Sequence, residues 1–287
     1  MIVAAGLTPA WQQILVFDRV RIGQVNRAKK AVWCGSGKVL NVGAALHRLG
    51  AKSLTLCPVG GTTGQQIRDD FAARGITAHW LTTSVATRVC TTILDEGAGT
   101  TTELVENSDP LSEAELDEFV AAFADVARVA SVVVLCGSLP QGAPTNYYRR
   151  LLDRTPARAI LDVRGRELIE CLPARPFLVK PNREELAATV GRSLESEDDV
   201  ANAMSELRTL GAEWVVVSDG PAALLALGPD GLYRIEPPRV KVINPIGCGD
   251  ALCAELAVRI EQQWSVVDAI REAAANASKR ASELLPC

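Results

Sequence analysis

Short apolar runs recur along the chain, separated by longer segments in which apolar residues repeat every three or four positions. An apolar run without alternation is typical of a parallel strand that is buried on both faces. We therefore predict strands over residues 2–5, 54–59, 132–135, 160–163, 177–179 and 214–218. The spacing between these strands leaves room for a helix after most of them.

Helical periodicity fills that space. It predicts helices over residues 41–49, 63–74, 112–127, 198–210, 251–262 and 266–282. Gly50 and Gly75 stand where a left-handed residue would end the first two. Strands that alternate with helices predict an α/β fold with a mostly parallel, doubly wound sheet and helices on both faces.

Two regions, about 10–33 and 87–107, do not follow this alternation. In the second, residues 89–94 and 101–105 flank Asp95-Glu96-Gly97-Ala98-Gly99, which reads as a hairpin with a long loop. We predict that both regions form a small antiparallel sheet that acts as a lid. Residues 1–287 are then one domain with an inserted lid.

Composition narrows the class of protein. Of the 287 residues, 48% are apolar and 22% charged, and the net charge is −4, which gives no reason to expect nucleic acid as the main partner. No apolar run is long enough for a membrane span, and the first residues do not resemble a signal peptide. The eight cysteines form no C-x-x-C pair and only two histidines are present, which favours reduced cysteines in a cytoplasmic protein.

The segment Asn244–Ala251 carries the strongest chemical signal. A strand over 239–243 is expected to end there, Gly247 and Gly249 make a turn, and a helix begins. Backbone N–H groups and the helix dipole suit this turn to an anion. Asp250 is either a helix cap or a general base beside that anion site, and the turn alone leaves both open.

The stretch Gly35–Gly43 is a loop of small residues that enters a helix. It lacks the Walker A pattern because valine follows Lys38, and it lacks G-x-G-x-x-G because Leu40 takes the third glycine position. It is either a plain helix start or a sugar-binding loop in which Asn41 bonds hydroxyls.

Lys180-Pro181-Asn182 follows another predicted strand. Asn182 and Glu185 are three residues apart and share one helix face, so their oxygens suit Mg²⁺ held through water. The alternative is an exposed, charged helix start. The segments 136–140 and 217–220 also follow buried strands, where α/β sheets bind ligands.

Together these segments resemble the PfkB (ribokinase-like) family of carbohydrate kinases, in its hexose-phosphate branch of 1-phosphofructokinase, tagatose-6-phosphate kinase and the minor 6-phosphofructokinase. The resemblance spans the chain in order. The matching segments are Leu7-Thr8-Pro9-Ala10, Val25-Asn26-Arg27-Ala28, Gly37-Lys38, Asn41-Val42, Thr87-Arg88, Thr102-Glu103-Leu104-Val105-Glu106, Gly137-Ser138-Leu139-Pro140, Lys180-Pro181-Asn182 and Gly247-Cys248-Gly249-Asp250.

The resemblance implies a ribokinase-like three-layer α/β/α sandwich with a β-sheet lid, through which many members dimerise. It implies ATP and Mg²⁺ as cofactors and a small sugar phosphate as substrate. It implies these roles: Asp250 as catalytic base with Gly247, Cys248 and Gly249 as anion hole; Gln12, Gly37, Lys38 and Asn41 at the sugar; Arg27, Arg88 and Ser138 at its phosphate; Lys180, Asn182, Ser218, Gly220 and Asn276 at ATP; and Asn182 with Glu185 at the metal.

Some positions depart from the branch. Gln12 replaces an aspartate that binds sugar hydroxyls, Ser36 and Val39 replace glycines of the sugar loop, and Cys248 replaces alanine or serine in the anion hole. The favoured function is an ATP-dependent kinase of a ketohexose phosphate, with fructose 1-phosphate first and tagatose 6-phosphate or fructose 6-phosphate next. The alternatives are a non-catalytic sugar-phosphate sensor and a kinase of an unphosphorylated sugar or nucleoside.

Overall fold

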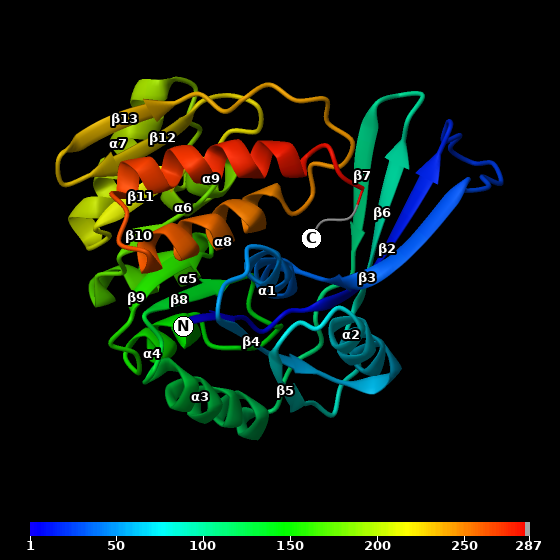
Figure 1. The fold of residues 1–287 in the computed structure, drawn as a ribbon, viewed down its shortest axis with the longest axis horizontal. Helices are drawn as coiled ribbons and strands as arrows, with labels where there is room; N and C mark the ends of the chain where they lie inside the picture. Colours follow the sequence, from blue (N-terminus) through cyan, green and yellow to red (C-terminus); the bar gives the residue numbers. More distant parts are fainter. Residues whose placement is uncertain (285–287) are drawn as a thin grey trace.

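A computed structural model describes residues 1–284 of the chain. Helices cover both faces of one large sheet, and a second, smaller sheet projects from its side (Figure 1). The predicted α/β architecture with a separate small sheet is confirmed. Its layers place the loops that follow the parallel strands along a single edge.

The large sheet has the strand order β13-β12-β11-β10-β9-β8-β1-β4-β5. Its strands are Ile2–Ala5 (β1), Ser53–Val59 (β4), Ala78–Thr82 (β5), Val132–Cys136 (β8), Arg158–Asp162 (β9), Leu178–Val179 (β10), Trp214–Val217 (β11), Leu224–Gly228 (β12) and Gly231–Ile235 (β13). The β11–β12 and β12–β13 pairs at one end are antiparallel, and the other pairs are parallel. The six strands predicted from apolar runs are all present, whereas β5, β12 and β13 were not predicted.

The helices of the described chain are Lys38–Arg48 (α1), Gly61–Ala73 (α2), Glu113–Ala127 (α3), Tyr147–Leu152 (α4), Gly165–Cys171 (α5), Arg183–Val190 (α6), Glu197–Leu210 (α7), Cys248–Glu261 (α8) and Val266–Arg280 (α9), with a 3₁₀ turn at Leu172–Ala174. Each predicted helix matches one of them to within about three residues at either end. Through residue 284, none of these helices combines the length and apolar character needed to cross a membrane.

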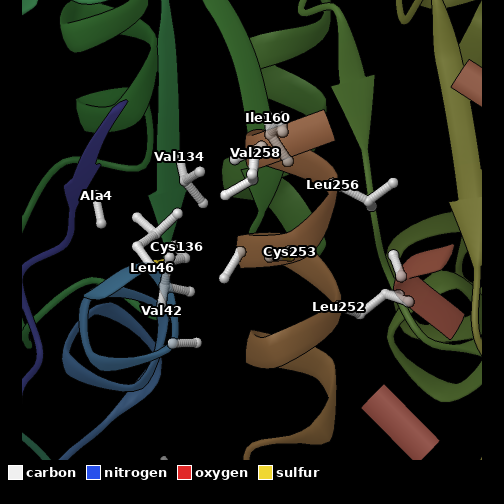
Figure 2. Packing of buried hydrophobic residues seen from close by; sticks show 14 of the residues in the cluster. Ala4, Val42, Leu46, Val134, Cys136, Ile160, Leu252, Cys253, Leu256 and Val258 are labelled. Atoms are coloured by element: carbon white, nitrogen blue, oxygen red, sulfur yellow. The ribbon is translucent and has the colours of Figure 1, made fainter. Parts of the chain in front are cut away.

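The two faces of the sheet support two separate cores. Ile2 and Ala4 of β1 pack with α1, α8 and α9, whereas Val3 and Ala5 pack with α3 to α7. Figure 2 shows the first core, where α8 meets α1 and the central strands. Burial on both faces explains why the strands appear in the sequence as unbroken apolar runs.

The small sheet, called the lid below, has the order β3-β2-β6-β7. Its strands are Ala10–Phe17 (β2), Lys30–Ser36 (β3), Val89–Asp95 (β6) and Thr100–Val105 (β7). It consists of two antiparallel hairpins, but β2 and β6 pair in parallel, so the sheet is mixed and not antiparallel throughout as predicted.

The two faces of the lid differ. On one, Ile14, Val16, Cys34 and Leu94 form a small apolar cluster that contacts Leu284. On the other, the rings of Trp11 and Trp33 are stacked with their centroids 5.9 Å apart.

The predicted strand over 239–243 is wrong. These residues have no strand pairing, and the side chains of Val242 and Ile243 are half exposed. Pro237 and Pro238 precede the segment, and neither has an N–H to donate to a ladder. The segment is instead held by the end of α9, where Ala281 O accepts from the N–H groups of Ile243 and Asn244.

Candidate active site

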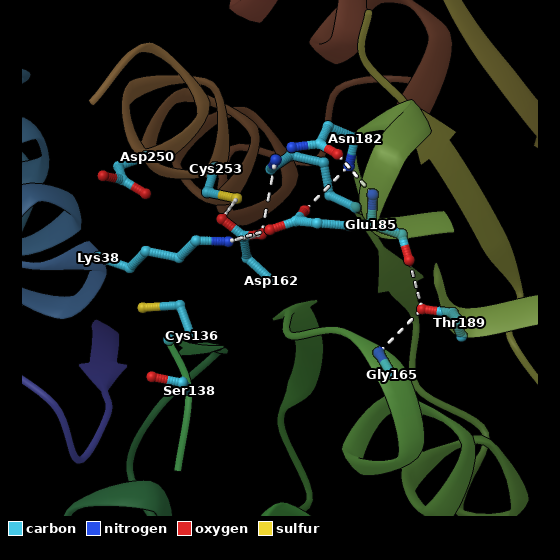
Figure 3. Close-up of polar contacts among 12 residues, drawn as sticks. Lys38, Cys136, Ser138, Asp162, Gly165, Asn182, Glu185, Thr189, Asp250 and Cys253 are labelled. Atoms are coloured by element: carbon cyan, nitrogen blue, oxygen red, sulfur yellow. Dashed lines mark hydrogen bonds and ion pairs between the residues drawn. The ribbon is translucent and has the colours of Figure 1, made fainter. Parts of the chain in front are cut away.

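Charged side chains from distant parts of the chain meet at the carboxyl edge of the large sheet (Figure 3). Lys38 begins α1, Asp162 ends β9 and Asp250 lies in the first turn of α8. This edge is where open α/β sheets bind ligands, so the location fits the sequence prediction.

Asp162 joins most of these groups, although it was not among the predicted site residues. Its carboxylate is 1% exposed and accepts a hydrogen bond from Lys38 Nζ at 2.8 Å. Lys180 Nζ is 3.6 Å away, and the Cys253 thiol donates to it at 3.7 Å. Burial acts to raise the pKa of Asp162, but Lys180 and Lys38 outweigh it and hold the pKa below its usual value. Asp162 is therefore an anion that fixes two lysines.

Asp250 is also buried, with 6% of its surface exposed. Its Oδ2 accepts from Asn41 Nδ2 at 2.7 Å. Burial raises the pKa of Asp250 to about 6 and the charge of Asp162 raises it too, whereas Lys38 and the bond from Asn41 act in the opposite direction. A carboxylate with that pKa can take up a proton near neutral pH, which a general base requires.

The turn before Asp250 has the backbone of an anion site. Gly247 is left-handed at φ 83°, a conformation that favours glycine, and α8 starts at the next residue. The N–H groups of a first helical turn have no partner inside the helix, so those of Gly249 and Asp250 are available to a ligand. A Cβ on Gly249 would lie 3.4 Å from Lys180 Nζ, which places that ammonium beside the turn.

The N–H of Cys248 donates to Pro245 O at 3.3 Å within this turn, so it is not available to a ligand as those of Gly249 and Asp250 are. Burial raises the pKa of the Cys248 thiol to about 11, and the nearby Arg280 offsets only part of that rise. The thiol is therefore neutral at physiological pH, and it adds no negative charge to the anion site.

Asn182 and Glu185 form a capping box at the start of α6. Asn182 Oδ1 accepts from the Glu185 N–H at 2.7 Å, and Glu185 Oε2 accepts from the Asn182 N–H at 3.0 Å. The other oxygen, Glu185 Oε1, accepts from Lys38 Nζ at 3.1 Å. Within residues 1–284 no three acidic, histidine or cysteine side chains gather in a metal-binding group. The donor set thus fits a Mg²⁺ ion that keeps its waters better than one enclosed by protein ligands.

Lys38 and Gly37 occupy the loop predicted to hold the sugar. The Lys38 ammonium points to Asp162 and Glu185, on the side of α6. Burial lowers the pKa of Lys38, but the surrounding carboxylates reverse this effect and raise it overall. Gly37 has φ 88°, and a Cβ there would lie 2.9 Å from Thr8 O, so the loop can pass the segment that leads into β2 only with glycine at this position.

Two other predicted substrate residues lie near the base of the lid. Gln12 is buried on β2, and its Nε2 donates to Thr92 Oγ1 on β6 at 2.8 Å. Ser138 follows β8, and its Oγ lies 3.3 Å from Thr8 Oγ1. The amide of Gln12 is thus used within the lid, whereas the exposed Ser138 borders the carboxyl edge.

The two predicted phosphate-binding arginines differ in setting. Arg88 is held rigidly, because its guanidinium donates to the carbonyls of Thr8, Pro9 and Glu106 at 3.0 to 3.3 Å. Arg27 is exposed in the loop that joins β2 to β3. The structure therefore places Arg88 at the base of the lid, and Arg27 in a loop of the lid.

The residues predicted at ATP lie at and beyond the ends of β10 and β11. The backbone of Ser218 pairs with that of Asn182 in an isolated parallel β-bridge. Gly220 follows in an exposed turn with φ 54°. Asn276 lies on α9, where its amide donates to Glu272 Oε1 at 3.2 Å. Lys180, Asn182 and Ser218 are thus neighbours, and Asn276 comes from a separate helix.

Known proteins share both this sequence pattern and this fold. The sequence model described as pfkB family carbohydrate kinase matches residues 14–284. The tetrameric inhibited form of phosphofructokinase-2 from Escherichia coli is 26% identical, with a TM-score of 0.90 over 98% of this chain and 93% of that one.

Two further solved structures share the fold at 20% identity. A possible 1-phosphofructokinase from Thermotoga maritima has a TM-score of 0.91 over 100% of this chain and 94% of that one. Arabidopsis thaliana ribokinase complexed with ribose and ATP has a TM-score of 0.76 over 98% and 92%. The fold is therefore ribokinase-like, as the sequence resemblance implied.

Proposed function

The chain belongs to the pfkB family of carbohydrate kinases, and from this premise we propose that it transfers a phosphoryl group from ATP to a hydroxyl of a ketohexose phosphate. The observation that carries the proposal is Asp250, a buried carboxylate with a pKa of about 6 at the start of α8. Its neighbours supply a backbone anion site and the ammonium groups of Lys180 and Lys38, which phosphoryl transfer requires.

In the proposed mechanism Asp250 accepts the proton of the attacking hydroxyl. The oxygen of that hydroxyl forms a bond to the γ-phosphorus as the bond to ADP breaks. The N–H groups of Gly247, Gly249 and Asp250 donate to the transferred phosphoryl oxygens, and Lys180 adds positive charge beside them. The chain's contribution is position and charge, with a single proton held at Asp250 Oδ.

As a carbohydrate kinase the protein uses ATP. We assign the nucleotide to Lys180, Asn182, Ser218, Gly220 and Asn276. ATP supplies the transferred group, and Mg²⁺ would lower the charge on its phosphates. Glu185 and Asn182 would hold that ion through its waters, since both Glu185 oxygens already accept bonds from the protein.

For the substrate, we place sugar hydroxyls at Asn41, Gln12 and the Gly37-Lys38 loop. The existing phosphate would lie at Arg88 and Ser138, with Arg27 from the lid. The phosphofructokinase-2 relative has also been solved in complex with fructose-6-phosphate, and it is 26% identical to this chain. Fructose 1-phosphate is our first choice, followed by tagatose 6-phosphate and fructose 6-phosphate.

A substrate panel tests this function. We expect ADP release with at least one phosphorylated ketohexose at a kcat/KM about 100-fold or more above that for free fructose, ribose or a nucleoside, because paired arginine–phosphate contacts are strong. Phosphorus NMR of the product assigns the accepting hydroxyl. Turnover of the unphosphorylated compounds alone would indicate another branch of the kinase family. Thermal stabilisation by a ligand without turnover would favour a sensor.

We further propose that copies of the chain form a homodimer through the lid. Trp33, Leu104 and Val105 expose 44%, 55% and 57% of their surfaces there, and Ile22 and Val25 of the β2–β3 loop are more exposed still. Light scattering is expected to give a dimer, and Leu104→Asp to shift it towards the monomer. A wild-type monomer at micromolar concentration would contradict this assignment. The E. coli relative has also been solved as a tetramer.

We propose a cytoplasmic location. All seven cysteines through residue 284 are unpaired, and most are buried, as is usual in a reducing compartment.

A further inference from the structure

Three buried polar side chains form a line that ends at Asp250. Ser36 Oγ on β3 lies 3.1 Å from Asn41 Oδ1 on α1, and Asn41 Nδ2 lies 2.7 Å from Asp250 Oδ2. The three residues are 2%, 3% and 6% exposed. The line thus connects strand β3 of the lid to the Asp250 carboxylate at the carboxyl edge of the large sheet.

The direction of these bonds follows from the groups themselves. A carboxylate only accepts, so Asn41 presents its NH₂ to Asp250, and its carbonyl oxygen then faces Ser36. The Ser36 hydroxyl donates to that oxygen and so holds the amide in place, while the carboxylate sets which end of the amide faces Asp250. If the amide turned by half a rotation, its oxygen would face the Asp250 carboxylate, and the two acceptors would repel.

We propose that Ser36 is a positioning residue that holds the Asn41 amide with its NH₂ towards Asp250, and so sets how readily Asp250 ionises. The expected effect on kcat rests on the proposed function, whereas the expected effect on the Asp250 carboxyl does not. Ser36 itself acts only through Asn41.

Several other charged or titratable groups face Asp250. They are Lys38 on α1, Asp162 at the end of β9, Lys180 after β10, Cys136 on β8, and Cys248 and Cys253 on α8. A change at Ser36 leaves all of them in place. The bond from Asn41 lowers the pKa of Asp250, so a loosened amide should let that pKa rise.

The experiment compares Ser36→Ala with wild type, with Ser36→Thr, which keeps the hydroxyl, and with Ser131→Ala. The Ser131 hydroxyl bonds Glu261 and the chain's first residue at the opposite, amino edge of the sheet. Ser131→Ala is therefore a control that removes a bonded hydroxyl far from Asp250. For Ser36→Ala we expect the acid limb of kcat to move about 0.5–1 pH unit higher, a loss of about 2- to 5-fold at pH 6, and little change at pH 8. Ser36→Thr should keep the acid limb at its wild-type pH whatever its absolute rate, and Ser131→Ala should follow wild type.

A second readout needs no activity. Proteins labelled with ¹³C at the aspartate carboxyl are titrated by NMR, with Asp250→Asn identifying the signal, and Ser36→Ala should raise that pKa. If the pKa moves but no sugar phosphate is turned over, the proposed function fails and the role of Ser36 stands. If the enzyme is active and neither the pKa nor the acid limb moves, the role of Ser36 is refuted, and equal shifts in Ser131→Ala would also refute it.

Discussion

Replacing Asp250 with asparagine is expected to lower the turnover number by about 100-fold or more, the usual scale for a positioned base. Asparagine has nearly the same shape and can still accept a bond from Asn41, but it cannot take a proton. In the wild type kcat/KM should fall as the pH drops through about 6, because Asp250 then becomes protonated. Steady-state kinetics from pH 5 to 9 measure both effects, and near-wild-type turnover of Asp250→Asn would show that another group is the base.

The same substitution should stabilise the protein. The pKa of Asp250 is about 6 in the folded protein and near 3.8 when unfolded, so its ionisation costs stability as the pH rises through 6. We therefore expect Asp250→Asn to melt roughly 2–6 °C higher at pH 8, with the difference vanishing towards pH 4. Asp230→Asn, an exposed change in the turn between β12 and β13, should alter neither melting temperature nor turnover. A less stable Asp250→Asn would mean that its activity loss reflects damage to the fold.

Replacing Asp162 with asparagine is expected to have the largest effect on stability, a loss of about 3–5 kcal/mol at pH 7. Lys180 is 3% exposed, and Asp162 is its ion-pair partner at 3.6 Å, so the substitution leaves a buried ammonium without its counter-charge. Turnover should fall as well, because Lys38 loses its bond to the same carboxylate. Chemical denaturation and initial rates give the two quantities.

A second substitution separates charge from packing. In the Asp162→Asn protein, Lys180→Met removes the unpaired ammonium, so it should restore much of the lost stability. Activity should stay low, since the cation beside the Gly249 turn is then absent. If Lys180→Met restores no stability, the effect of Asp162 does not arise from an unpaired charge.

Most strands buried on both faces were predictable from the sequence, since their apolar runs are continuous, as in Val132–Cys136, although the similar run of β12 was missed. Strand β13 was not, because its side chains alternate between intermediate and exposed positions before Ile235, and β5 alternates in a similar way. The error over 239–243 has the opposite cause. The alternation of basic residues and valine in Arg239-Val240-Lys241-Val242 is typical of a strand, but the end of the stretch is held by Ala281 at the end of α9.

The site residues also divide into those in local motifs, which the sequence reveals, and those whose role depends on distant contacts. Asp250 and the Asn182–Glu185 pair lie in local motifs, so they could be found from spacing alone. Asp162 lies within the predicted strand 160–163 and belongs to none of the motifs identified. An acidic residue at the carboxyl end of a buried strand was the available signal. Its role depends on Lys38, 124 positions away, and the fold alone brings the two together.

The division of the site between two sheets has an evolutionary consequence. Asp162 and Lys180 belong to the large sheet, where loss of one charge leaves the other buried without its counter-charge. These positions should therefore tolerate few substitutions. Gln12 and Ser36, which depart from the related branch, lie on lid strands and contact neutral groups. A lineage could therefore change its choice of sugar through the lid, one neutral substitution at a time, while the machinery for phosphoryl transfer was inherited intact.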